Sequence, residues 1–508
     1  MDRIGSGTSS YSILRAALPP VVALAAALWH GPFVIDDAYI TFRYAENLAS
    51  GAGLVFNPGE PVLGTSSPLM AMLLALFHLA GEEIPLAALE LGIASGMLIV
   101  FIAQRLAARF VGPWEAAAVG ICLALHPDLT LVANSGMETG LSMCAVYGTL
   151  LMTLRRKYLF AGLLGGVAFL LRPDGALVVA LAAGHALLHA PRRAWQPLAA
   201  AGVVAAPWLI YATVTYGGVV PHSIAAKQLI HADAALHILV RNFQRLVYGP
   251  VMEVLCLLAV VGLGRALLRK AGLLLLAVWM LSYLSGLSAS GIAPIFPWYV
   301  TPLFPGVVIL AGFGLAGVSA RLLARRAKPS QRRQRVSQAA MPVGLALVGV
   351  FAWLDSPAWR AIHEDQFGRV RTYLAIGNFL RERCDPGDYV FVGEVGALAY
   401  TLPDQSILDS SGINSPEIYQ ERKADLARQQ ASAGSELRAQ DSPAWVLNVI
   451  SRYQPRYVIT HRPWLHIRHI VTVPLVRDAY RRITLNVPGM ENYYILERNA
   501  ASADRGGE

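Results

Sequence analysis

Apolar segments recur along this chain, and short loops rich in Lys and Arg separate many of them. A helix needs about 20 apolar residues to cross a bilayer, so this series predicts an α-helical polytopic membrane protein. Composition agrees, because 55% of the residues are hydrophobic and 15% are charged, against about 25% charged in soluble domains. The net charge of +9 comes from basic loops that orient a protein in the bilayer, so we expect a lipid partner and no nucleic acid.

The apolar segments and basic loops together predict about eleven spans, with the N-terminus in the cytoplasm and the C-terminus outside. The first segment contains Pro19 and Pro20 and lacks a convincing cleavage site, so we interpret it as a retained helix. Residues 68–80 are short for a span and are expected along the outer surface. The expected spans are 12–32, 86–104, 112–130, 140–154, the segment ending before Arg172, 176–190, 197–214, 250–267, 272–289, 300–320 and 340–354.

The predicted membrane domain covers residues 1–354, with outer loops at 33–85 and 215–248. Beyond it, a helical pattern over 360–383 ends at the turn signal Asp385-Pro386-Gly387-Asp388. Helices and strands then alternate, which predicts a small extracytoplasmic α/β domain over 355–499 and a disordered tail over 500–508. The expected strands are 389–392, 406–409, 456–460 and 492–497, with helices near 416–430 and 442–453.

Two adjacent carboxylates, Asp36 and Asp37, directly follow the first span. Charge is costly at a membrane, so ionisable residues at its boundary usually have a function. On a helix that begins near Asp36, the residues Asp36, Tyr39 and Arg43 share one stripe. An N-cap of an interfacial helix is the structural alternative for Asp36.

Further polar residues fall at the outer ends of the predicted spans. A transporter more often places its acidic groups near mid-membrane, so this clustering favours an enzyme that works at the outer leaflet. The aromatic pair Trp298-Tyr299 among them fits either stacking on a sugar or anchoring at the membrane interface. The set comprises Asp36, Asp37, Glu138, Arg172, Asp174, His222, Lys227, Trp298 and Tyr299.

Each of the other polar candidates also has a structural alternative. Arg172 could simply pair with Asp174, and Lys227 could extend toward lipid headgroups. Glu138 could cap the helix that follows it. His222 could be an ordinary loop histidine.

The string from Asp36 to Tyr44, followed by residues 47–48 and 51–60, resembles the first outer loop of GT-C glycosyltransferases. The likeness is greatest to the terminal β-(1→2)-arabinofuranosyltransferase-like family of mycobacterial-type cell walls. This chain has His222-Ser223 where the family has Asn-Thr, and Met70 where a motif ends in Trp, so the sugar and acceptor stay open. Further similar motifs follow in the family order: Ser135–Thr139, Leu171–Gly175, Pro221–Lys227, Glu394–Tyr400, Leu408–Gly412 and Pro416–Glu417.

The resemblance implies a GT-C fold and an inverting glycosyltransferase in the bacterial inner membrane. The enzyme would move one sugar, arabinofuranose or a related one, from a polyprenyl-phosphate donor to a cell-envelope glycan or glycolipid at the outer face. Asp36 would be the general base, and Asp37 would position it, bind the acceptor or help to hold a divalent cation, Mg²⁺ or Mn²⁺. The remaining family positions would bind substrate: Tyr39, Arg43, Glu138, Arg172, Asp174, His222, Lys227, Trp298 and Tyr299.

Within this scheme Arg43, Arg172 and Lys227 are the candidate cations for the leaving phosphate. A nearby cation such as Arg43 is also expected to lower the pKa of Asp36. Three alternatives remain beside this function. They are a transferase of another sugar, such as mannose or a modified pentose, onto lipopolysaccharide, a lipid-linked sugar flippase or transporter, and a non-catalytic relative that binds glycolipid.

Overall fold

The computed structural model describes residues 6–231, 234–269, 271–291, 297–324, 331–354, 356–432, 444–462, 467–487 and 489–499. The tail expected over 500–508 lies outside these residues. The chain forms two compact units. The helical unit comprises Met1–Phe33, Ala88–Trp208 and Asp233–Ile362, and the mixed unit comprises Val34–Ala87, Leu209–Ala232 and His363–Glu508.

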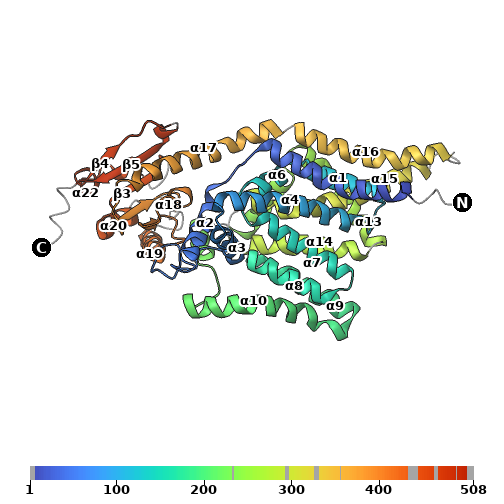
Figure 1. Cartoon of the computed structure of the whole chain (residues 1–508), viewed down its shortest axis with the longest axis horizontal. Coiled ribbons are helices and arrows are strands. Elements are labelled where there is room, and N and C mark those ends of the chain that lie inside the picture. Colours follow the sequence, from blue (N-terminus) through green and yellow to red (C-terminus); the bar gives the residue numbers. More distant parts are fainter. Residues whose placement is uncertain are drawn as a thin grey trace. The chain divides into compact units, whose positions relative to one another are not determined.

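The helical unit is built from long apolar helices joined by short loops and single 3-10 turns (Figure 1). Its turns are η1 (Pro173–Gly175), η2 (Pro191–Arg193), η3 (Pro297–Tyr299) and η4 (Thr301–Leu303). Its helices are α1 (Ser6–His30), α4 (Ile84–Ala107, of which the part from Ala88 belongs here), α5 (Pro113–Ala124), α6 (Pro127–Asn134), α7 (Thr139–Leu154), α8 (Tyr158–Leu171), α9 (Ala176–His189), α10 (Trp195–Tyr216, of which the part up to Trp208 belongs here), α12 (Ala235–Leu246), α13 (Pro250–Arg269), α14 (Ala271–Ala289), α15 (Phe304–Ala324) and α16 (Gln331–Leu354).

In the described part of the chain, six helices are long and apolar enough to cross a membrane, so this is a multi-pass membrane protein. The pair α5 and α6 gives a seventh span if its two halves, bent by 62°, are counted as one. Pro127 opens α6 at this bend, and the His126 side chain accepts a hydrogen bond from the amide of Asp128. Several predicted spans fall on shorter apolar helices such as α7 and α8, so the count of eleven stays a prediction.

Helices α13 and α15 pack closely because glycines lie at their crossing. A Cβ atom built on Gly314 of α15 would lie 2.9 Å from the backbone nitrogen of Gly262 in α13, too close for any other residue without a shift. Small residues at such crossings let membrane helices approach, which matters where lipid supplies no hydrophobic driving force.

Replacing Gly262 with Leu is expected to destabilise the protein by about 1–3 kcal/mol or more, because the new side chain would overlap the α15 backbone. Gly264 supplies the matched control, since a Cβ there meets nothing within 4 Å. Thermal unfolding of the detergent-solubilised variants measures the difference. Equal midpoints for Gly262→Leu and Gly264→Leu would show that the close crossing is not needed.

The mixed unit combines three stretches of chain around one sheet (Figure 1). Its strands are β1 (Tyr389–Val392), β2 (Ser406–Asp409), β3 (Tyr457–His461), β4 (Tyr480–Ile483) and β5 (Tyr493–Arg498). Its helices and one 3-10 turn are α2 (Asp36–Ala49), α3 (Pro68–Leu79), α11 (His222–His231), α17 (Ser356–Arg381, of which the part from His363 belongs here), α18 (Ala397–Tyr400), α19 (Pro416–Ser432), α20 (Ala444–Tyr453), α21 (Ile467–Ile470), α22 (Pro474–Arg477) and η5 (Met490–Asn492).

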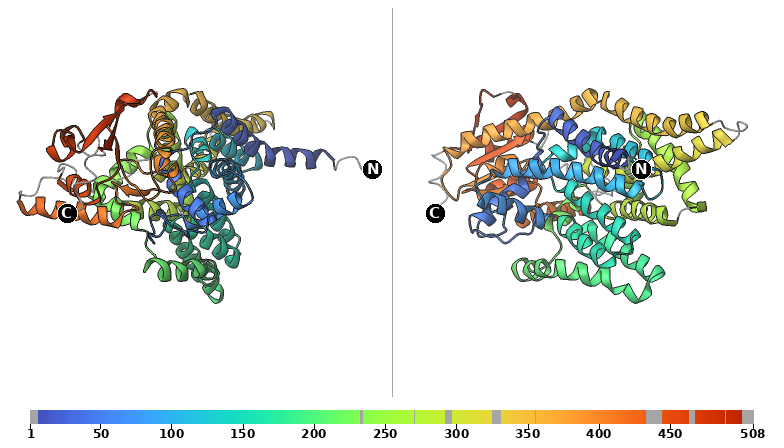
Figure 2. Two further views of the ribbon diagram at one scale, coloured as in Figure 1. Left: turned by 60° about the vertical axis from the view of Figure 1, so that its left-hand side comes forward. Right: turned by 45° about the vertical axis from the view of Figure 1, so that its right-hand side comes forward.

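The sheet has the strand order β2-β1-β3-β5-β4, and its strands lie together in both views of Figure 2. Strand β1 runs parallel to β2 and β3, with Val390 opposite both Ile407 and Tyr457. Strand β5 runs antiparallel to β3 and β4. The four strands expected from the sequence are confirmed to within a residue. Strand β4 was not predicted, because its central Arg481 and Arg482 are exposed and obscure the apolar pattern.

Both faces of the sheet are covered, which explains why its central strands are apolar throughout. Phe391, Val458 and Leu496 point into a core that includes Trp445 of α20. On the opposite face, Tyr373 of α17 meets Tyr493 of β5 edge to face, with 5.1 Å between ring centroids. Helix α17 is therefore packed against the sheet beside the turn that follows β1.

Candidate functional site

The turn after β1 occupies the position where open α/β sheets usually bind ligands. From β1 the chain proceeds to β2 on one side, and it later returns to β3 on the other side. Parallel strands that diverge in this way leave a crevice at their carboxyl ends. Residues 393–396 form this turn, which we call the acid turn because it contains Glu394.

The Asp36 carboxylate is fixed by the acid turn. Its two oxygens accept hydrogen bonds from the backbone amides of Gly396, at 3.0 Å, and Ala397, at 2.8 Å. Asp36 is the first residue of α2, whose N-cap is Ile35. The interpretation of Asp36 as the cap of its own helix is therefore wrong, since its side chain instead binds the first amides of α18.

This contact requires glycine at position 396. A Cβ atom built there would lie 2.7 Å from the Cγ atom of Asp36, inside the range that real Cβ atoms avoid. The backbone of the turn can approach the carboxylate only because the side chain is missing.

Partial burial and the neighbouring charge of Asp37 raise the pKa of Asp36 to about 6, although the two amide hydrogen bonds and Arg369 act in the opposite direction. The expectation that Arg43 lowers this pKa is wrong, because burial dominates and the nearby cation is Arg369 of α17. A carboxyl of this kind is ionised at neutral pH and is a better base than an ordinary aspartate.

Glu394, Arg369 and Tyr373 complete the surroundings of Asp36. Glu394 begins one of the motifs noted in the sequence, whereas Arg369 and Tyr373 were not predicted. The Nη1 atom of Arg369 lies 2.7 Å from the Oε1 atom of Glu394. Burial and the negative charge of Asp36 raise the pKa of Glu394 to about 8, opposed by Arg369. One available signal was that Arg369 and Tyr373 are four residues apart on the predicted helix 360–383, so they share a face.

Arg43 is buried, with 1% of its surface exposed, and its guanidinium binds backbone carbonyls. These hydrogen bonds join α2 to the loop between α2 and α3 and to the segment after α18. Burial lowers the pKa of Arg43 to about 10, so the side chain remains charged at neutral pH. The carbonyl acceptors are those of Phe56 (2.6 Å), Leu402 (2.7 Å), Gln405 (3.0 Å) and Ala399.

Tyr39 lies in an aromatic cluster one turn after Asp36. Its ring centroid is 5.0 Å from that of Phe42 and 5.5 Å from that of Tyr400 in α18. Burial and the charge of Asp36 raise the pKa of Tyr39 to about 12, so its hydroxyl remains protonated. The structure thus brings Tyr39 and Asp36 together, as the helical stripe predicted.

His222 and Lys227 lie on α11, in the mixed unit. The backbone amide of His222 donates to the carbonyl of Leu63 at 2.7 Å. Its Nδ1 atom lies 3.3 Å from the carbonyl oxygen of Ile413, and its ring meets Tyr419 edge to face at 5.1 Å. His222 therefore packs between the α2–α3 loop and the segment after β2. Lys227 is half-buried further along the same helix.

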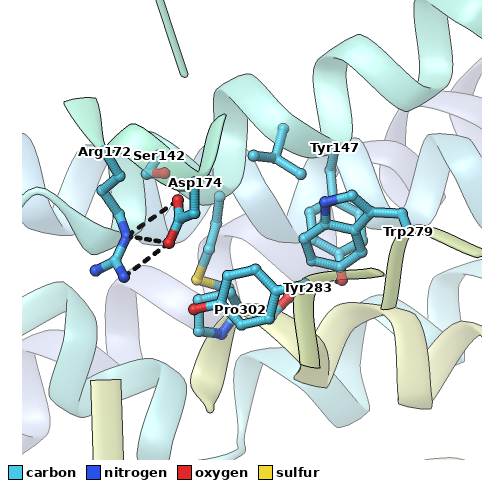
Figure 3. Close-up of a pocket in the computed structure, with 9 residues that line it drawn as sticks. Ser142, Tyr147, Arg172, Asp174, Trp279, Tyr283 and Pro302 are labelled. Carbon is cyan, nitrogen blue, oxygen red and sulfur yellow. Dashed lines mark hydrogen bonds and ion pairs between the residues drawn. The ribbon is translucent and has the colours of Figure 1, made fainter. Parts of the chain in front are cut away.

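A second polar group, in the helical unit, forms around Arg172. Its Nη1 atom lies 3.3 Å from Oε1 of Glu138. Its Nη2 atom lies 3.0 Å from Oδ2 of Asp174, a contact drawn in Figure 3. The structural pairing of Arg172 with Asp174 is confirmed. Glu138 makes no capping hydrogen bond to α7, so that alternative is wrong, and its carboxylate binds Arg172.

Aromatic residues surround this ion-pair group. Figure 3 shows a narrow cavity with Arg172 and Asp174 on one side and Tyr147 and Trp279 on the other. The hydroxyl of Tyr283 donates to the carbonyl of Tyr299 at 2.8 Å, and the Tyr299 ring lies 5.8 Å from the Arg172 guanidinium carbon.

Trp298 is 5% exposed. Its indole therefore packs inside the helical unit and does not anchor at the lipid interface, so that alternative is wrong for Trp298.

Six of the predicted residues thus form two groups, each inside one unit, whereas Arg43, His222 and Lys227 belong to neither group. Asp36, Asp37 and Tyr39 gather at the acid turn, and Glu138, Arg172 and Asp174 form the ion-pair group. That they serve one common site stays a prediction. Among the described residues no three His, Cys, Asp or Glu side chains are arranged to hold a metal ion, so the expected divalent cation finds no ligand set there.

Comparison with known protein families matches residues 360–501 to a domain of unknown function (DUF8728). A terminal β-(1→2)-arabinofuranosyltransferase of Corynebacterium glutamicum is 28% identical over 260 residues, which cover 44% of this chain and 38% of that protein. The terminal β-(1→2)-arabinofuranosyltransferase of Mycobacterium tuberculosis is 28% identical over 226 residues, which cover 39% of this chain and 35% of that protein. The chain thus matches under two fifths of the length of these relatives.

Solved structures resemble the chain over nearly its whole length. ArnT from Cupriavidus metallidurans in the apo state matches with a TM-score of 0.61 at 14% identity, covering 98% of this chain and 99% of that one. The same protein has been crystallised with undecaprenyl phosphate. The oligosaccharyltransferase AglB from Archaeoglobus fulgidus matches with a TM-score of 0.57 at 12% identity, covering 98% of this chain and 75% of that one. Its structure is a complex with an inhibitory peptide and a dolichol-phosphate. An oligosaccharyltransferase of Archaeoglobus fulgidus has also been crystallised with Zn and sulfate.

Proposed function

We propose that this chain, whose fold is that of the GT-C glycosyltransferases, transfers one sugar from a polyprenyl-phosphate carrier to a cell-envelope acceptor. The observation that carries this function is the Asp36 carboxylate, fixed by two amide hydrogen bonds and basic enough to accept a proton near neutral pH. The sugar is arabinofuranose or a related one, which the 28% identity to terminal arabinofuranosyltransferases supports. Mannose or a modified pentose on lipopolysaccharide is the alternative within the same fold.

In the proposed reaction Asp36 removes the proton of the acceptor hydroxyl while that oxygen attacks the anomeric carbon. A new carbon–oxygen bond forms, and the bond between the anomeric carbon and the phosphate oxygen breaks on the opposite face. The electron pair leaves with the lipid phosphate, and the configuration inverts. Asp37 adds negative charge that raises the proton affinity of Asp36. No step is assigned to a metal ion.

The leaving phosphate needs a cation, and three candidates are available. We assign this role to Lys227, in the motif that resembles the Ala-Lys ending of the family. Arg43 is proposed as a positioning residue, because its guanidinium binds carbonyls. Arg172, between two carboxylates, is proposed to orient Glu138 and Asp174 toward substrate.

The proposed location is the bacterial cytoplasmic membrane, with the N-terminus inside and the residues after 355 outside. The apolar helices and basic loops support this orientation. At the outer face nucleotide sugars are absent, which fits a lipid-linked donor. An accessibility tag at the C-terminus that reacts only from the cytoplasm would contradict the proposed orientation.

Membranes that contain the protein test the function directly. Given polyprenyl-phosphate carrying a labelled sugar, they are expected to move the label into envelope glycan or glycolipid and to release polyprenyl phosphate. Membranes without the protein supply the control. Label that crosses the bilayer still attached to its lipid carrier, with no transfer, would indicate a flippase.

A further inference from the structure

The acid turn is bound by a cation of α17 that the reaction above does not use. The Nη1 atom of Arg369 donates to the Oε1 atom of Glu394 at 2.7 Å. We propose that Arg369 is a positioning residue for Asp36: through Glu394 it fixes the turn whose amides bind the Asp36 carboxylate. This inference rests on the proposed role of Asp36 as the base. It gives the C-terminal domain a part in orienting that base.

The acid turn is held at both of its ends. At its start, the backbone amide of Gly393 donates to the carbonyl of Ile459 in β3 at 2.8 Å. At its end, the amides of Gly396 and Ala397 donate to the Asp36 carboxylate. The start is thus attached to the sheet. Whatever holds the residues in between determines where the amides at the far end point.

Arg369 binds the turn between these two ends. Its contact with Glu394 has the length of a charge-assisted hydrogen bond, a class about twice as strong as neutral hydrogen bonds. The two side chains are 21% and 13% exposed, so water and salt screen the pair less than they screen a surface ion pair. The contact therefore restrains the turn more than an exposed salt bridge would.

Helix α17 is itself fixed to the sheet. Tyr373 is fully buried, and its ring meets that of Tyr493 in β5 edge to face at 5.1 Å. Arg369 lies four residues before Tyr373, so the two side chains share a face of the helix. The packing that holds Tyr373 against the sheet thereby directs Arg369 to the acid turn. All of these residues belong to the mixed unit.

The charge of Arg369 also acts on the base. Burial and the charge of Asp37 raise the pKa of Asp36 to about 6, and Arg369 acts in the opposite direction. Removal of this cation is therefore expected to raise the pKa of Asp36 further, which leaves less of the base ionised near neutral pH. The titratable groups that interact with Asp36 are Asp37 and Tyr39 of α2, Arg369 and Tyr373 of α17, and Glu394 of the acid turn.

Hydrogen exchange of the acid turn tests the positioning and does not require activity. Arg369→Gln and Glu394→Ala should each speed exchange over residues 394–400 about tenfold or more, as expected for the loss of a hydrogen bond between charged groups. The double variant should show no further increase, because both changes remove the same contact. Additive increases would show that the two residues act separately and would overturn the inference.

Two comparisons show whether the effect is local. Exchange over β3 and β5 should stay like that of the wild type, and an equal increase there would indicate general loss of the fold and overturn the inference. Arg456→Gln is the matched control. Arg456 pairs with Glu497 at 3.4 Å and directly precedes β3, whereas the acid turn lies at the opposite end of the parallel strand β1. Its replacement should leave residues 394–400 unchanged.

Kinetics separate positioning from direct binding of the donor. Arg369→Gln should lower kcat by up to about 10²-fold, as misplacement of a reacting group does, without changing the KM for the donor. The ascending limb of its kcat/KM profile, near pH 6 in the wild type, should move to higher pH. Arg369→Lys keeps the charge and should return the limb toward pH 6.

Two kinetic results would overturn the inference. A rise in KM with kcat unchanged would make Arg369 a ligand of the lipid phosphate. An unshifted limb together with normal exchange in the acid turn would leave Arg369 without a part in orienting Asp36. Absence of any sugar transfer by wild-type protein would instead contradict the proposed function, while the exchange experiment would still decide whether Arg369 holds the turn.

Discussion

Replacing Asp36 with Asn is expected to lower the rate of sugar transfer by about 10²–10⁴-fold, the usual contribution of a general base. The side chain keeps its size but can no longer accept a proton from the acceptor hydroxyl. The measurement is transfer of labelled sugar at saturating donor, at a pH above 6 where wild-type Asp36 is ionised. Turnover close to that of the wild type would show that Asp36 is not the base.

Two controls separate chemistry from structure in this variant. The NH₂ group that Asp36→Asn introduces would face the amide donor of Gly396 or Ala397, so hydrogen exchange of residues 394–400 should be compared with the wild type. Asp478→Asn removes an exposed carboxylate that pairs with Arg477, and it should leave transfer unchanged. Loss of transfer with normal exchange in the acid turn identifies a missing base.

Replacing Arg43 with Met is expected to destabilise the mixed unit by about 1.5–3 kcal/mol or more, the usual contribution of a hydrogen bond to a charged group. Methionine fills the space of the aliphatic stem, but four carbonyls would lose their charged donor, and those of Phe56, Ala399 and Leu402 would keep one weaker neutral donor each. These carbonyls belong to the loop between α2 and α3 and to the segment around α18, so both segments should open. Hydrogen exchange over residues 54–58 and 398–406 measures this, and exchange like that of the wild type would contradict the role given to Arg43.

Arg383→Met supplies the comparison for Arg43. Arg383 is on the same unit, its side chain is 44% exposed, and it donates to the carbonyl of Phe379 in the preceding helix. Its removal should change the free energy of unfolding by less than about 0.5 kcal/mol, as at most surface positions. Arg43→Lys keeps the positive charge and tests the need for the guanidinium geometry. One ammonium group cannot reach all the carbonyls that a planar guanidinium binds together.

The order of helices and strands could be predicted from the sequence because hydrophobic patterning determines it locally. The turn signal at Asp385–Asp388 and the apolar runs at 389–392 and 406–409 gave β1 and β2 their observed bounds. The edge strand β4 was not predicted, because only its first residue is buried and its last is half-buried. The bend between α5 and α6 was also missed, although Pro127 marks it.

The candidate site was predictable only in part, because its contacts join residues distant in sequence. Asp36 and Tyr39 could be placed on one stripe by helical spacing, which the structure confirms. The partners of Asp36 lie 360 and 361 residues away along the chain, and no periodicity reveals them. For the same reason Arg43 looked like a substrate cation, since its carbonyl acceptors at Ala399, Leu402 and Gln405 are defined only by the fold.

The most direct test of the central claim compares wild-type and Asp36→Asn protein in liposomes that contain a polyprenyl-phosphate-linked labelled sugar and an envelope acceptor on the outside. Wild-type liposomes are expected to yield labelled acceptor of inverted anomeric configuration together with free polyprenyl phosphate, and the variant neither. If both proteins moved label across the bilayer still attached to its carrier, and neither formed labelled acceptor, the protein would be a transporter and the proposed role of Asp36 would be wrong.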